Sequence, residues 1–103
     1  MPERDEVVEP RGNLTQTLET LRNELNDCLA RHEYAMAAQF QRCIMAVLDA
    51  LNGTVPMTNE VRVNLFNGLG DSLESMADQV RVPNLAESYL AYSGQFREMS
   101  RRD

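Results

Sequence analysis

Apolar residues recur at helical spacing along most of the chain, and the most apolar stretch runs from Glu33 to Leu51. Its main stripe advances mostly by three or four residues and consists of Tyr34, Ala37, Phe40, Ile44, Val47, Leu48 and Leu51. This spacing predicts a helix with one buried face. Further Ala and Met residues fall outside the stripe, so the helix is apolar on more than one side and we expect other helices around it.

A second amphipathic stripe precedes this helix and has leucines at spacings of four, three, four and four: Leu14, Leu18, Leu21, Leu25 and Leu29. Asn13 is the expected N-cap. Arg31 and His32 end the helix, where positive charge suits the C-terminal dipole. Because only a few residues around His32 join the two helices, they should be antiparallel neighbours. Asn52 and Gly53 should end the following helix, with Gly53 in the left-handed conformation.

A third helical stripe follows an expected N-cap at Thr58 and continues to about residue 80. Gly68 and Gly70 interrupt it, and each costs about 1 kcal/mol relative to Ala in a helix interior. Residues 71–74 also resemble a capping box. The element can therefore be one continuous helix, a kinked helix or two short helices, and we expect a break or kink near Gly70.

A last helix is expected after Pro83, with Asn84 and Glu87 in a capping-box pattern and a stripe of Leu85, Tyr89, Tyr92, Phe96 and Met99. No segment has a strand pattern. The predicted fold is all-α, a small up-and-down bundle of four to five amphipathic helices. Residues 1–12 should be a flexible charged leader, residues 13–99 a single bundle domain and residues 100–103 a frayed end.

The charge balance argues against nucleic acid as a partner. The 103 residues carry a net charge of −6, spread along the chain, whereas phosphate binding needs a basic stripe. All ten basic residues are Arg and none is Lys. Either codon bias or avoidance of lysine modification explains that composition. The longest apolar run, residues 44–48, is far shorter than the ~20 residues that span a bilayer.

The candidate chemistry does not converge on a reaction centre. Cys28 and His32 are one helical turn apart, but antiparallel packing offsets Cys28 from Cys43 by roughly ten ångströms along the helices. The two thiols are therefore expected to be core residues rather than zinc ligands. Two cysteines make no disulfide framework, which favours an intracellular setting, cytoplasmic or nuclear. Because the chain has one histidine and no nucleophile motif, we expect that it binds no cofactor and is not an enzyme.

Two resemblances add to this interpretation. Residues 24–92 resemble the helical domain shared by steroid receptor RNA activator protein and the C-terminus of the COPII outer-coat subunit, through the order of ELNDC, QFQRCIMAVLDAL, NG, VPMTNEV, LFNGLGDSL and NLAESYLAY. This resemblance implies a non-enzymatic scaffold or coregulator domain. Residues 34–40, YAMAAQF, are similar to the Tyr/Phe-x-x-Ala-Ala-x-Leu core of the UVR helical hairpin of excision-repair proteins. That similarity implies an antiparallel hairpin of the first two helices.

The predicted function is that of a non-enzymatic protein–protein interaction module, of the scaffold, adaptor or coregulator type. Its contact surface should lie on the last two helices, where Phe66 and Leu90 fall off the main stripes. The expected partner-binding residues are Phe66, Asp71, Glu74, Asp78, Glu87, Tyr89, Leu90 and Tyr92. Self-association as a homodimer through the same face is equally compatible. The alternative is a small acidic inhibitor or immunity-type protein that blocks a basic surface of its partner.

Overall fold

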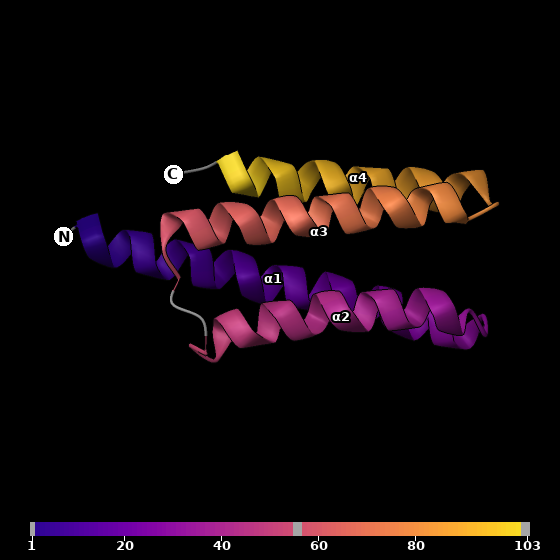
Figure 1. Cartoon of the computed structure of the whole chain (residues 1–103), viewed down its shortest axis with the longest axis horizontal. Helices are drawn as coiled ribbons and strands as arrows, with labels where there is room; N and C mark the ends of the chain where they lie inside the picture. Colours follow the sequence, from indigo (N-terminus) through magenta and orange to yellow (C-terminus); the bar gives the residue numbers. More distant parts are fainter. Residues whose placement is uncertain (1, 55–56, 102–103) are drawn as a thin grey trace. The chain divides into compact units, whose positions relative to one another are not determined.

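The computed structural model describes residues 2–54 and 57–101, and these residues form four helices and no strand. The helices are α1 (Pro2–Ala30), α2 (Tyr34–Leu51), α3 (Asn59–Gln79) and α4 (Pro83–Arg101), as Figure 1 shows. The predicted fold class, all-α with four to five helices that run up and down, is therefore confirmed. None of the described helices combines the length and apolarity needed to cross a membrane.

The chain divides into two compact units, Met1–Met57 and Thr58–Asp103. Each unit is a hairpin of two antiparallel helices, α1 with α2 in the first and α3 with α4 in the second (Figure 1). The sequence predicted a single domain over residues 13–99, and that stays a prediction because each hairpin is described by itself.

α1 is longer than the sequence indicated, because it begins at Pro2 instead of at an N-cap at Asn13. Proline is favoured at the first helical position, where its missing N–H has no helical partner to lose. The residues expected to form a flexible leader are therefore helical from residue 2 onwards, and the helix continues through Pro10 and Gly12.

The buried side of α1 also differs from the predicted leucine stripe. The buried residues follow spacings of three and four in alternation: Leu14, Thr17, Leu21, Glu24 and Cys28. Repeated steps of four residues drift around a helix of 3.6 residues per turn. Leu18 and Leu25 are accordingly half-buried, and Leu29 is 44% exposed. The α2 stripe is largely confirmed, except that Tyr34 is 61% exposed.

Both helices of the first hairpin end in the same backbone motif. After α1, the His32 N–H donates to the Leu29 carbonyl at 3.1 Å and the Glu33 N–H donates to the Cys28 carbonyl at 2.9 Å. His32 has φ 61°, the left-handed conformation that this Schellman motif requires. After α2, Gly53 takes the same place with φ 78°, which confirms the predicted end of that helix.

In the second hairpin, α3 continues through Gly70, so the expected break near Gly70 is wrong. Its predicted N-cap is confirmed, since the Thr58 hydroxyl accepts a hydrogen bond from the Val61 N–H at 3.1 Å. α4 begins at Pro83, and Asn84 lies inside the helix instead of capping it. Ser100 is buried, which corrects the expected frayed end at that position. Residues 102 and 103 lie outside the described residues.

Candidate interaction surface

The eight predicted partner-binding residues all lie in the α3–α4 hairpin, but two of them are not on its surface. Phe66 and Tyr89 have no exposed area at all. Phe66 shares a side of α3 with Leu69 and Leu73, at spacings of three and four, so its ring belongs to the buried side of the helix. The prediction that Phe66 and Tyr89 contact a partner is therefore corrected, because both rings are core residues.

The other six predicted residues remain accessible to different degrees. Leu90 is 52% exposed and Tyr92 is half-buried. Two residues along a helix correspond to a rotation of about 200°, so Leu90 and Tyr92 do not share a face. The four acidic residues, Asp71, Glu74, Asp78 and Glu87, are exposed.

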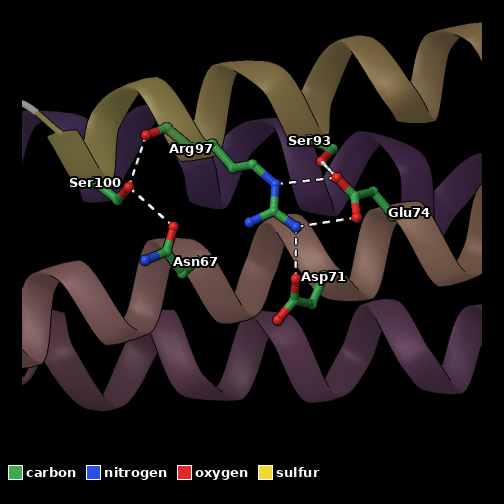
Figure 2. Close-up of polar contacts among 6 residues, drawn as sticks. All are labelled: Asn67, Asp71, Glu74, Ser93, Arg97 and Ser100. Carbon is green, nitrogen blue, oxygen red and sulfur yellow. Dashed lines mark hydrogen bonds and ion pairs between the residues drawn. The ribbon is translucent and has the colours of Figure 1, made fainter.

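Two of these acidic residues are already engaged within the hairpin. Figure 2 shows Arg97 of α4 reaching across to α3, where its Nε donates to Glu74 Oε2 at 3.0 Å and its Nη2 lies 3.0 Å from Glu74 Oε1. The same Nη2 donates to Asp71 Oδ1 at 2.5 Å. Ser93, which is buried, donates its hydroxyl to Glu74 Oε2 at 3.0 Å. One guanidinium therefore binds two carboxylates one turn apart.

These contacts shift the acid–base equilibria of the pair. The hydrogen bond from Arg97 is the main cause that lowers the pKa of Glu74, and the bond from Ser93 adds to it. In return, hydrogen bonds to Glu74 and then Asp71 raise the pKa of Arg97. Both shifts favour the charged forms. Arg97 and Glu74 therefore stabilise each other in their charged forms.

The polar contacts continue towards the C-terminal end of α4. The Ser100 hydroxyl lies within hydrogen-bond distance of two acceptors that share its one proton, Asn67 Oδ1 at 3.0 Å and the Arg97 carbonyl oxygen at 2.6 Å (Figure 2). Further along, Arg62 donates to the carbonyl of Met99 and to Asn59 Oδ1. These bonds fix the relative register of α3 and α4.

Gly70 makes room for Arg97. A Cβ atom built at Gly70 would lie 3.0 Å from Arg97 Cγ and 3.3 Å from its Cζ and Nε. At Gly68, one half-turn away, an added Cβ would meet nothing within 4 Å. The absence of a side chain at position 70 thus allows the Arg97 side chain to lie along α3 and reach its carboxylates.

The register of the hairpin also places the remaining candidates. Glu74 and Ser93 are in contact across the hairpin. Asp78 lies one turn after Glu74 on α3, and Leu90 lies one turn before Ser93 on α4. Because the helices are antiparallel, Asp78 and Leu90 are therefore at the same height, one turn closer to the connection between the helices. Glu87 is a further turn along α4, on the side of Leu90. We call Asp78, Glu87 and Leu90 the Leu90 surface. Among the described residues, neither of its two carboxylates has an ion-pair partner.

The cysteine and histidine side chains, which are the candidate metal ligands and nucleophiles of the sequence, lie in the first hairpin. Cys28 and Cys43 are buried, and neither is in a disulfide. His32 is exposed, with its Nδ1 2.9 Å from the Tyr34 hydroxyl. Among the side chains that the structure describes, no three of His, Cys, Asp or Glu converge in a way that could hold a metal ion.

Arg97 and Ser93 are the residues that the sequence prediction missed. The signal was present as two complementary series. Ser93, Arg97 and Ser100 recur at spacings of four and three on α4, as do Asn67, Asp71 and Glu74 on α3. Each spacing places its series on one side of its own helix, but which members meet depends on the register of the hairpin.

The comparisons with known proteins add no relative. No protein-family model matches the chain, and neither the curated proteins nor the solved structures give a significant match. The resemblances to the steroid receptor RNA activator domain and to the UVR hairpin therefore stay predictions.

Proposed function

We propose that this chain is a non-enzymatic protein–protein interaction module that binds its partner through the Leu90 surface of the α3–α4 hairpin. The observation that carries the proposal is the 52% exposure of Leu90 beside two carboxylates that lack an ion-pair partner among the described residues. Protein–protein interfaces typically combine an apolar centre with a polar rim. Leu90 would bury its side chain against the partner, and Asp78 and Glu87 would select for positive charge.

A second candidate is the acidic inhibitor, which would block a basic surface by charge alone. The net charge of −6 favours it. Arg97 counts against it, because this guanidinium already neutralises much of the charge of Asp71 and Glu74. Only Asp78 and Glu87 would then be available on this part of the hairpin. The interaction module is therefore the better-supported proposal.

Affinity capture with paired variants tests the proposal. The full chain is immobilised, and proteins captured from a lysate of the source organism are quantified by mass spectrometry. A partner of the Leu90 surface should be lost with Leu90→Arg and retained with Leu29→Arg, which places the same substitution at another exposed leucine. Equal capture by both variants and the unaltered chain would exclude the Leu90 surface.

Salt dependence separates the two candidates. For the interaction module, the apolar contact of Leu90 should retain much of the binding when ionic strength rises to about 1 M, where screening acts over about 3 Å. For the acidic inhibitor, binding should fall steeply over the same range and should be insensitive to Leu90→Arg.

A further inference from the structure

α2 has an exposed face that is largely apolar. Six exposed residues lie along it at spacings of one, three or four: Ala35, Ala38, Arg42, Met45, Ala46 and Asp49. They occupy the side of α2 opposite Phe40, Cys43 and Val47, which are buried. Met45 is 56% exposed. Its flexible thioether side chain is of a kind that usually packs against other apolar groups. We call these six residues the α2 open face.

The two charged residues of this face are placed symmetrically about its centre. Arg42 lies three residues before Met45, and Asp49 lies three residues after Ala46. Neither has an ion-pair partner among the described residues. The midpoint of the two charges therefore falls between Met45 and Ala46. A face with opposite charges at equal distances from its midpoint is complementary to itself when one copy is reversed.

We propose that the α2 open face joins two copies of this chain into an antiparallel, two-fold symmetric dimer. With the two-fold axis between Met45 and Ala46, Arg42 of each copy lies level with Asp49 of the other, which gives two equivalent ion pairs. The Met45 side chains of the two copies meet at the centre. The proposal concerns α2 and does not rest on the Leu90 surface or its function.

The charges select the antiparallel orientation. In a parallel pair of α2 helices, Arg42 would face Arg42 and Asp49 would face Asp49, and like charges in contact repel. Helices pack 8–10 Å apart, depending on the size of the side chains between them. The three alanines of the face allow a close approach, so that Met45 can contact the second copy along its length.

Sedimentation velocity on the full chain tests the dimer directly. The unaltered chain should sediment as a dimer at high concentration and dissociate on dilution. Arg42→Glu and Asp49→Arg should each turn both ion pairs into repulsive contacts and raise the dissociation constant about tenfold or more. The double variant Arg42→Glu/Asp49→Arg restores opposite charges in the same geometry, so it should dimerise like the unaltered chain.

Control variants separate this contact from other causes. Arg22→Glu makes the same charge change at an exposed position of α1 and should leave the dimer intact. Leu90→Arg should also leave it intact, because Leu90 lies on the other hairpin. Circular dichroism should show unchanged helicity for every variant. A monomeric unaltered chain, single variants that still dimerise, or a double variant that stays monomeric would each overturn the proposal.

Discussion

At Gly70, α3 lies so close to the Arg97 side chain that a Cβ atom would crowd it. The distance of 3.0 Å from its built Cβ to Arg97 Cγ is shorter than ordinary van der Waals contact. Glycine at this position therefore has a packing role, although the sequence pattern indicated a helix break. Gly68 has no such neighbour, and the two glycines form a matched pair on one helix.

We expect Gly68→Ala to stabilise the protein by about 1 kcal/mol, since alanine is the better helix former and its Cβ meets open space. Gly70→Ala should give a smaller gain or a loss, because the new Cβ pushes Arg97 away from Asp71 and Glu74. Urea unfolding of both variants measures the difference. Equal stabilisation would show that the Arg97 side chain gives way at no cost.

Glu74 gives the α3–α4 contact a dependence on pH. Because its pKa is lowered below the ordinary value of 4.5 in the folded chain, ionised Glu74 stabilises the fold above that value. The contribution is lost as the pH falls through the lowered pKa. Stability measured by urea unfolding should therefore decline on acidification, and Glu74→Gln should remove this part of the decline while lowering stability at pH 7.

Glu87→Gln is the control for this measurement, because Glu87 is exposed and has no ion pair among the described residues. Its pH profile should follow that of the unaltered chain. The role assigned to Arg97 would be contradicted if Glu74→Gln and Glu87→Gln had the same profile.

At the scale of the helices, the two Schellman motifs that end α1 and α2 differ in one residue. Gly53 adopts φ 78° without a steric penalty, whereas His32 adopts φ 61° with a Cβ atom. A non-glycine residue in this conformation costs roughly 1–2 kcal/mol. The contact of the His32 ring with Tyr34, with ring centroids 5.9 Å apart, offsets part of that cost.

His32→Gly should therefore raise the thermal unfolding midpoint, because glycine adopts the left-handed conformation without a steric penalty. Gly53→Ala should lower the midpoint, because it places a Cβ atom in that conformation. Tyr34→Ala separates the ring contact from the backbone effect, since it removes the contact and keeps His32. If His32→Gly destabilised the protein as much as Tyr34→Ala does, the ring contact would outweigh the backbone strain.

Most helix ends could be predicted, because they depend on local chemistry. Thr58 at an N-cap and Gly53 after a C-terminus act through hydrogen bonds within a few residues. The α1 start and the continuity of α3 could not be predicted. Single Pro and Gly residues indicate where a helix can end, but in both elements the helix continues through them.

The site was predicted less well than the helices. Periodicity placed Asp71, Glu74 and Asp78 on one side of α3, but it did not show which residues of α4 lie opposite. Which residues lie opposite depends on the register of the hairpin, and this register places Arg97 in ion pairs with two of the three carboxylates. Burial of Phe66 depends likewise on the neighbouring helix, because a residue beside the main stripe is covered or exposed according to what packs there.

At the scale of the whole chain, each compact unit packs two helices that follow one another, α1 with α2 and α3 with α4. Each hairpin therefore closes only a short connection before its apolar surfaces meet. Proteins dominated by such local contacts search few conformations and typically fold within microseconds to milliseconds. Temperature-jump relaxation should show folding at this speed. Because the helices bury their apolar stripes early in folding, the chain should spend little time in partly folded forms with exposed apolar surface, from which aggregates grow.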